Sequence, residues 1–176
     1  SLYFAAPGPG QIAVKGYWFY QDKDGVDQPL RDAKVEIWDS DASGDTLLET
    51  THTDNRGYYA SGNIENNDSE GGGQDIYVKV FATDDRSVRV TDFSSSSKLY
   101  YSATEVQNDV SDGEVDLGSY SLDDSNNRMA WYIYDVIAND AFDYLADNVG
   151  CSSGNGVNVV YAGKGNPAEI RSNAFQ

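Results

Sequence analysis

Hydrophobic and polar residues alternate in several short stretches of the chain, a period of two that is typical of half-buried β-strands. In the first stretch, residues 11–20, the residues from Ile12 to Trp18 repeat this pattern at every second position. The stretches 33–37 and 76–81 show the same alternation. Further extended segments are expected at 46–53, 57–59, 87–90, 98–106 and 114–120.

Turn-forming residues separate these segments. Asp54-Asn55-Arg56-Gly57 and Asp112-Gly113 are examples, and Gly, Asp and Asn recur between the others. Short strands at a spacing of about ten residues indicate an antiparallel β-sandwich. An apolar arm precedes it in residues 1–10, where Leu2-Tyr3-Phe4-Ala5-Ala6 leads into a Pro/Gly hinge.

The pattern changes near the C-terminus. Residues 128–149 contain no Gly or Pro and place apolar residues at steps of three and four, which predicts one long helix. Two extended segments follow, 157–161 and 169–171. We therefore expect a mainly β protein with a sandwich over residues 11–121 and an α/β appendage over residues 122–176. An appendage of that size should pack on the sandwich or on a partner.

Acidic residues dominate the charge, because 29 Asp and Glu stand against 12 Lys and Arg, for a net charge of −17. Such a surface repels nucleic acid and anionic membranes. No stretch approaches the ~18 apolar residues of a membrane-spanning helix. Asp supplies 22 of the acids, and its short carboxylate favours turns and cation sites over helix surfaces. A halophilic or simply well-solvated surface is the alternative.

Cys151 is the only cysteine and His52 the only histidine. Together they exclude an intrachain disulfide, a zinc finger and a Cys/His nucleophile pair within this sequence. Because most enzyme mechanisms thereby lose their usual general base, we expect no catalysis.

The densest cation signature is Asp22-Lys-Asp24-Gly25-Val-Asp27. Carboxylates at alternate positions, with a glycine for a sharp turn, resemble the front half of an EF-hand loop. The bidentate Glu of that loop is missing, because its position is occupied by Ala33. Calcium at Asp22, Asp24 and Asp27 would need ligands from a second loop, and an Asp/Gly turn satisfied by its own backbone is the alternative.

A second acidic cluster contains Asp39, Asp41 and Asp45, directly after an expected strand. It is predicted either to share a calcium ion with the first cluster or to hold its own. A third acidic loop, residues 66–75, encloses three glycines and is interpreted as a solvated hairpin tip. Asn67 in this loop begins an Asn-Asp-Ser sequon and is a candidate glycosylation site.

Six aromatic residues suit either the core or a platform on which sugars stack, and core packing is the favoured interpretation. They are Tyr17, Trp18, Phe19, Trp38, Tyr58 and Tyr59. On the expected helix, Asp135, Asp140 and Asp143 are predicted to form a solvated face.

Part of the chain resembles a transthyretin-like module. The resemblance rests on Val14-Lys-Gly-Tyr17, Gln28-Pro-Leu-Arg-Asp-Ala-Lys-Val-Glu-Ile-Trp-Asp39, Thr53-Asp-Asn-Arg-Gly-Tyr-Tyr59 and Asp75-Ile-Tyr-Val-Lys-Val80. These segments are similar to carboxypeptidase regulatory-like domains and to the B-type repeats of Gram-positive surface adhesins. The resemblance implies a prealbumin-like (transthyretin/Ig-like) sandwich used as a spacer, stalk, oligomerisation or carbohydrate-contacting module, often with calcium in its loops.

A second resemblance covers the helix and the strand that follows it. Asn127-Arg-Met-Ala-Trp-Tyr-Ile-Tyr-Asp-Val-Ile137 and Val157-Asn-Val-Val-Tyr161 resemble the lead-in of a secreted gluzincin-type metallopeptidase. The H-E-x-x-H helix of that family is absent from this sequence. The alternative function is therefore an N-terminal accessory part of a secreted metallopeptidase-like protein.

These observations predict a secreted, calcium-stabilised, non-enzymatic structural or adhesive module of the cell surface. The arm residues Leu2, Tyr3 and Phe4 further predict assembly into an extracellular filament, with the arm of one copy adding a strand to the next. An unordered terminus or a cloning remnant is the alternative. The expected partners are other copies, cell-surface proteins and carbohydrate, without nucleic acid or membrane insertion.

Overall fold

The computed structural model describes residues 5–68, 71–92, 95–124, 127–141, 144, 147–148, 157–161 and 169–172. The arm residues Leu2, Tyr3 and Phe4 lie outside the described residues, as do Asp143 and Cys151. What the sequence predicts for them stays a prediction.

The strands are β1 (Gln11–Gln21), β2 (Asp27–Pro29), β3 (Lys34–Asp39), β4 (Thr46–His52), β5 (Tyr58–Ala60), β6 (Ile64–Glu65), β7 (Ile76–Phe81), β8 (Val88–Asp92), β9 (Ser95–Leu99), β10 (Tyr101–Ala103), β11 (Gly113–Leu122), β12 (Val157–Tyr161) and β13 (Glu169–Ser172). The helix α1 (Arg128–Asp135) continues directly into a π-helical segment, η1 (Val136–Ala141). No helix in the described part of the chain combines the length and apolarity that crossing a membrane requires.

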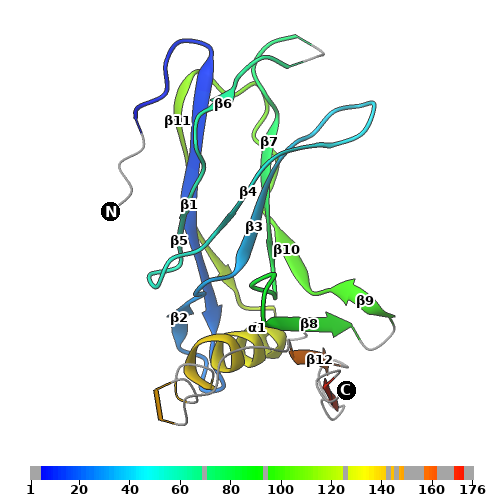
Figure 1. Ribbon diagram of the computed structural model, residues 1–176. Helices are drawn as coiled ribbons and strands as arrows, with labels where there is room; N and C mark the ends of the chain where they lie inside the picture. Colours follow the sequence, from blue (N-terminus) through cyan, green and yellow to red (C-terminus); the bar gives the residue numbers. More distant parts are fainter. Residues whose placement is uncertain are drawn as a thin grey trace.

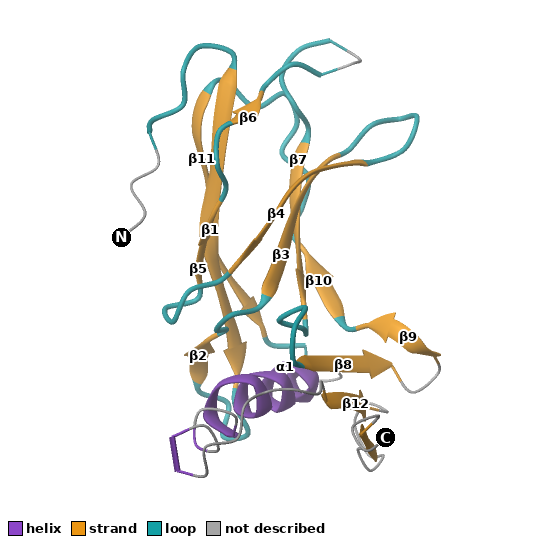
Figure 2. Cartoon of the chain, viewed as in Figure 1, coloured by secondary structure: helices purple, strands orange, loops and turns teal. Residues whose placement is uncertain are grey.

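Two sheets face each other and form a sandwich (Figures 1 and 2). In the first sheet β1 lies between β11 and β2, and β5 and β6 also pair with β1. The second sheet has the order β10-β7-β3-β4. The helix α1 lies across one end of the sandwich, the lower end in Figure 1. The prediction of a mainly β fold with a C-terminal helix is confirmed.

The central strand β1 alternates strictly between the core and the outer face of its sheet. Ile12, Val14 and Trp18 are at most 1% exposed, and Gly16 is buried as well. The residues at the alternate positions between them are half-buried. The facing sheet contributes Val35 and Val78, which are fully buried. Burying each such side chain contributes about 1.5–3 kcal/mol, so the alternation in the sequence is the main driving force for this arrangement.

The C-terminal segment shares the core of the sandwich. Its strands β12 and β13 extend a third sheet, with the order β13-β12-β8-β9. Trp131 and Tyr134 of α1 and Val159 of β12 belong to the same buried cluster as the residues of the sandwich. Packing of this kind is what a segment too small for a core of its own requires. The division into domains at residue 122 stays a prediction.

Among the described strands, two pairs are parallel rather than antiparallel. β11 runs parallel to β1, with Val14 opposite Val115, and β12 runs parallel to β8. Side chains alternate between the two faces of a sheet with a period of two in parallel and in antiparallel strands alike. The sequence pattern therefore does not distinguish parallel from antiparallel pairing. Two further strands, β2 and β6, were not predicted, because three and two residues are too short to show a period.

The single strand predicted at 98–106 is wrong, because the chain changes sheets at Tyr100. β9 belongs to the third sheet and β10 to the second. The Tyr100 ring packs against that of Tyr161 with 5.7 Å between centroids, and its hydroxyl donates to the Tyr161 carbonyl at 2.9 Å. The Tyr100 N–H donates to the carbonyl of Val90, and its own carbonyl accepts from Ala82. These contacts hold the chain where it crosses between sheets.

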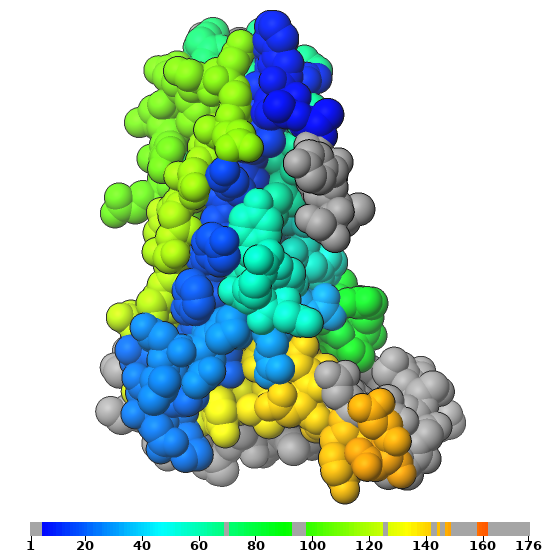
Figure 3. All heavy atoms as spheres, turned by 90° about the vertical axis from the view of Figure 1, so that its left-hand side faces the viewer, coloured from blue at the N-terminus to red at the C-terminus, as the bar shows by residue number. Residues whose placement is uncertain are grey.

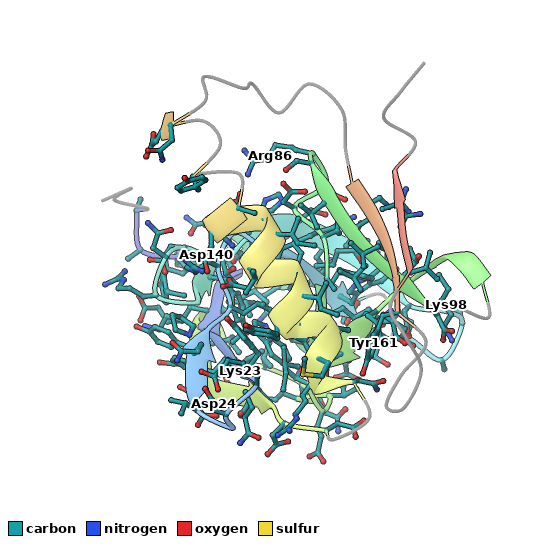
Figure 4. All side chains as sticks on the ribbon, turned by 90° about the horizontal axis from the view of Figure 1, so that it is seen from below. Lys23, Asp24, Arg86, Lys98, Asp140 and Tyr161 are labelled. Carbon is teal, nitrogen blue, oxygen red and sulfur yellow. The ribbon has the colours of Figure 1, made fainter. Side chains whose placement is uncertain are left out.

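The helix predicted over 128–149 is confirmed over 128–141. Asp135 at the end of α1 is only 1% exposed, so the prediction of a solvated acidic face is wrong for this residue. Its carboxylate accepts from the Arg31 guanidinium at 2.5 Å, from the Arg31 backbone N–H at 3.1 Å and from the Tyr20 hydroxyl at 3.0 Å. Asp140, labelled in Figure 4, contacts the same guanidinium at 2.9 Å and remains exposed.

These contacts favour the protonated forms of the two donors, Arg31 and Tyr20. The hydrogen bond to Asp135 raises the pKa of Arg31 above its ordinary value. Burial, followed by the negative charge of Asp135, raises the pKa of Tyr20. Both side chains therefore remain donors at neutral pH, and the end of α1 is fixed to the residues that follow β2.

Replacing Asp135 by alanine is expected to destabilise the protein by about 3 kcal/mol. Asp135→Ala leaves the partly buried guanidinium of Arg31 and the hydroxyl of Tyr20 without their acceptor. Urea denaturation followed by circular dichroism measures the loss. Asp140→Ala is the matched control, because it removes the exposed partner of Arg31 and should cost less than about 1 kcal/mol. Equal losses in the two variants would contradict the role given to the buried pair.

Candidate metal centre

Three acidic side chains meet at the end of the sandwich opposite α1. Asp39 is the last residue of β3, Asp41 lies in the loop between β3 and β4, and Asp68 comes from the loop between β6 and β7. One carboxylate oxygen from each lies within 4.8 Å of the other two. Both loops extend from the upper end of the sandwich in Figure 1. We refer to these residues as the three-carboxylate cluster.

The alternation of β3 places Asp39 on its inward face, two residues after Ile37, and its side chain is buried. The Asp39 Oδ1 accepts from the backbone N–H of Asp75 at 2.7 Å. The Asp75 carbonyl accepts in turn from the N–H of Ser40 at 2.9 Å. These two bonds join the end of β3 to the start of β7, so the position of the Asp39 carboxylate is fixed by two strands.

One oxygen of Asp41 is enclosed and has no hydrogen-bond partner among the described residues. This atom is Oδ1, whereas Oδ2 accepts from the Thr46 hydroxyl at 3.3 Å. A buried acceptor left without a donor costs about 1–3 kcal/mol, and more when it is charged. Coordination of a cation at Oδ1 would remove this cost.

The loop that carries Asp68 is anchored at both ends. Asn66 donates to the Val110 carbonyl at 2.9 Å and accepts from the N–H of Gln74 at 2.9 Å. A Cβ on Gly73 would lie 2.0 Å from the Val110 carbonyl oxygen, so only glycine allows this close approach. The ends of this loop are therefore fixed, whereas Asn67, Gly71 and Gly72 nearer its tip are exposed. The interpretation as a solvated hairpin tip stays a prediction.

The spacing of the three oxygens suits a calcium ion. Two oxygens bound to one Ca2+ at about 2.4 Å are at most about 4.8 Å apart, and the cluster meets that limit. Carboxylates are preferred ligands of Ca2+, which takes about six to eight oxygens and so leaves positions for carbonyls or water. In the described part of the chain, no Lys or Arg forms an ion pair with Asp39 or Asp41.

Burial raises the pKa of the Asp39 carboxyl above its ordinary value. The hydrogen bond from the Asp75 N–H opposes this shift, and the negative charges of Asp41, Asp68 and Asp75 add to it. The metal-free fold therefore places like charges close together with little solvent around one of them. A divalent cation would favour the ionised form and would compete with the proton for this site.

The predicted ligand Asp45 is engaged in other contacts. Its Oδ2 accepts from the Tyr77 hydroxyl at 2.6 Å and its Oδ1 from the Ser40 hydroxyl at 3.4 Å. Asp45 is not part of the three-carboxylate cluster. Its contacts hold the β3–β4 loop against β7 and so support the cluster indirectly.

The acidic turn between β1 and β2 lies at the opposite end of the sandwich, near α1 (Figures 1 and 4). Asp22 accepts from the backbone N–H groups of Asp24 and Val26 at 2.9 and 3.0 Å, and the bond from Val26 contributes most to lowering its pKa. Asp24 pairs with Lys23 at 2.5 Å, and Asp27 accepts from a serine of β11. This turn cannot share an ion with the three-carboxylate cluster. Calcium binding by the turn alone stays a prediction.

Sequence reasoning did not join Asp68 to the cluster. It placed Asp39 and Asp41 together correctly but assigned Asp68 to a separate loop, because no pattern relates two loops that meet only after folding. Asn67, next to Asp68, is exposed, as a glycosylated asparagine must be. Glycosylation at Asn67 stays a prediction.

Comparisons with known proteins assign no family to the chain, because no family model and no curated protein matches it. Several solved structures are similar to it in part, among them the three that follow. A 9R-lipoxygenase from Cyanothece PCC8801 shows 19% identity, covers 69% of this chain and 18% of its own, and has a TM-score of 0.44. An (S)-allantoin synthase shows 12% identity, with coverages of 65% and 42% and a TM-score of 0.36. The shaft pilin SpaA from Lactobacillus rhamnosus GG shows 13% identity, with coverages of 68% and 53% and a TM-score of 0.31.

The chain spans less than two thirds of each of these three proteins. At such identities and TM-scores the likenesses transfer no activity, substrate or partner to this chain. The relation to transthyretin-like modules therefore stays a resemblance. The comparisons lend no support to the resemblance of the helix and of residues 157–161 to a metallopeptidase.

The raised pKa of Asp39 predicts how the metal-free protein responds to pH. Asp39→Asn is expected to stabilise it by about 1 kcal/mol at neutral pH, because a buried charge among like charges is removed. The folded wild type binds a proton at Asp39 more tightly than the unfolded chain does. The difference in free energy of unfolding between the wild type and Asp39→Asn therefore disappears as the pH falls through the raised pKa of Asp39. Urea denaturation in chelator, at neutral pH and near pH 4, measures both effects.

The matched control for this comparison is Asp45→Asn. It neutralises a carboxylate of the same loop that accepts from Tyr77 and lies outside the cluster, so it should lower stability. A gain for Asp39→Asn of equal size at both pH values, or a gain for Asp45→Asn, would contradict the assignment of a repulsive cluster.

Proposed function

We propose that this chain is a non-enzymatic β-sandwich module of a secreted or cell-surface protein, stabilised by a calcium ion at Asp39, Asp41 and Asp68. The observation that carries the proposal is the enclosed Oδ1 of Asp41, which has no hydrogen-bond partner in the described part of the chain and lies beside two further carboxylates. An ion at this position ties the β3–β4 loop to the β6–β7 loop. It also neutralises part of a net charge of −17.

The chemistry of the chain supports a structural role. Its only histidine, His52, lies on β4, and the Nε2 atom is buried without a partner among the described residues. A general base must come within hydrogen-bond reach of the proton it removes, and an enclosed Nε2 is poorly placed for that. Extracellular modules bind Ca2+ with a Kd of about 10⁻⁴–10⁻³ M, an affinity that a site with three carboxylates can reach.

Calcium is expected to raise the melting temperature. A cation that binds only the folded state adds about 2.7 kcal/mol at a concentration of a hundred times Kd, which corresponds to about 5–10 °C for a domain of this size. Thermal melts of the wild type in calcium and in chelator measure the shift. The double variant Asp41→Asn/Asp68→Asn should lose it.

Asp24→Asn is the matched control, since it makes the same chemical change in the acidic turn at the opposite end of the sandwich. It should keep the full shift. Loss of the shift in Asp24→Asn and its retention in the double variant would move the ion to the turn between β1 and β2. Identical melting temperatures of the wild type in calcium and in chelator would contradict the calcium proposal.

Assembly through the N-terminal arm is the finer part of the proposal. Within the described residues β11 pairs only with β1, so its other edge has backbone groups able to accept an added strand. A protein that begins at Gln11 should remain monomeric where the longer chain forms fibres. Light scattering and electron microscopy, at high concentration and with calcium present, compare the two. If both are monomers, strand donation by Leu2, Tyr3 and Phe4 is ruled out.

A further inference from the structure

Three aromatic rings lie together on the outer face of the first sheet. Tyr17 and Phe19 occupy the outward positions of β1, and Tyr58 of β5 stands opposite Tyr17 in the sheet. The ring centroids of Tyr17 and Phe19 are 6.3 Å apart with 18° between the ring planes, and those of Tyr17 and Tyr58 are 5.1 Å apart. All three side chains are half-buried, so part of their surface remains in water. We refer to these residues as the aromatic patch.

The other aromatic residues of this group are differently placed. Trp18 and Tyr59 are 1% exposed and belong to the core, which confirms the favoured interpretation for these two. Trp38 lies on the other sheet, where the Lys79 ammonium stands 4.2 Å from its ring centroid and covers it. Among the six, the aromatic patch is therefore the group that combines adjacent rings with an outward position on one sheet.

Polar groups flank the aromatic patch along β11. Ser119 stands opposite Tyr17 in the sheet and Ser121 opposite Phe19, and both serines are exposed. Figure 3 shows this side of the molecule, with β1 running between β11 and the segment that contains β5. Hydroxyl groups and aromatic rings thus alternate across neighbouring strands of one open surface.

Two ion pairs lie at the margin of the patch. Lys15 contacts Glu114 at 2.6 Å, and Arg56 contacts Asp54 at 2.9 Å while lying 5.9 Å from the Tyr58 ring centroid. Asp116, opposite Lys15 in the sheet, and Asp27, which accepts from Ser121, add negative charge to this margin. A ligand at this surface therefore meets both donors and acceptors, and an anionic ligand is repelled.

We propose that the aromatic patch binds a neutral polysaccharide. Sugar rings present apolar C–H surfaces that pack on aromatic rings, and their hydroxyls exchange hydrogen bonds with serines and charged side chains. The net charge disfavours a polyanion, and it opposes the face-to-face contact with a second copy that would bury this patch. Because an open sheet face covers only one side of a ligand, a chain of sugars long enough to contact all three rings is better suited than a single sugar.

Affinity gel electrophoresis of the protein tests this, with soluble mannan and β-glucan as neutral probes and polygalacturonate as the anionic one. Sedimentation with insoluble cellulose and chitin extends the neutral set. The wild type should bind at least one neutral probe. Tyr17→Ala and Phe19→Ala should weaken binding about tenfold or more, since each removes a ring that packs on the sugar.

Two further variants make the test specific. Tyr17→Leu keeps most of the apolar volume and should also weaken binding, which guards against an alanine variant that fails to fold. Tyr101→Ala removes a ring that is 51% exposed on the opposite sheet and should leave binding unchanged. Circular dichroism and thermal melts confirm that each variant is folded.

Several outcomes would overturn the proposal. They are the absence of binding to every neutral probe, binding to polygalacturonate alone, and an equal loss in Tyr101→Ala. A wild-type dimer that Tyr17→Ala dissociates would also overturn it, because the aromatic patch would then be an interface between copies.

Discussion

The ion pair between Arg31 and the buried Asp135 is the contact on which the lower half of the structure depends. Both the backbone and the guanidinium of Arg31 donate to Asp135, and the Tyr134 hydroxyl donates to the carbonyl of Asp32 at 2.8 Å. These bonds tie the end of α1 to a single short loop and offset the cost of removing both charges from water. With α1 in this position, Trp131 completes the core.

The two ends of the sandwich present the same electrostatic problem, and at one of them the described residues include a positively charged partner. A buried carboxylate is costly unless it is neutralised by a partner. At the end closed by α1 that partner is Arg31, a residue of the chain itself. At the opposite end Asp39 and Asp41 form no ion pair with Lys or Arg of the described residues. A chain with 29 acidic and 12 basic residues has few cations for such positions, and a metal ion from solution can take that part.

Local patterns predicted the strands well and their partners poorly. Strict alternation located β1, β3 and β7 to within about two residues, because the period of a strand is written in consecutive side chains. No pattern of consecutive residues indicates that β1 pairs with β11 in parallel. Asp135 shows the same limit, since an acidic residue on a helix looks solvated until Arg31, 104 residues earlier in the chain, is known to lie beside it.

The candidate site was likewise predicted only as far as local sequence patterns describe it. The sequence indicated an acidic group at Asp39 and Asp41, because Asp-rich segments next to strands favour cations. It could not show that the Asp22 carboxylate accepts hydrogen bonds from the backbone of its own turn, and it did not connect Asp68 to the cluster. Calcium binding at Asp22 stays a prediction. Short-range hydrogen bonds within a turn and contacts between distant loops both depend on the folded backbone, which composition does not describe.

The parallel pairing of β1 with β11 also bears on how the protein is made. Ile12 pairs with Gly113, so the central strand of the first sheet waits for roughly 100 residues of intervening chain before that side is complete. Closing a loop of this length costs about 4 kcal/mol in chain entropy before the contacts between β1 and β11 contribute any stabilisation. During synthesis β1 therefore keeps one edge open until the ribosome has passed Leu122. Folding of this sheet is a late, long-range event, and the growing chain must avoid aggregation until then.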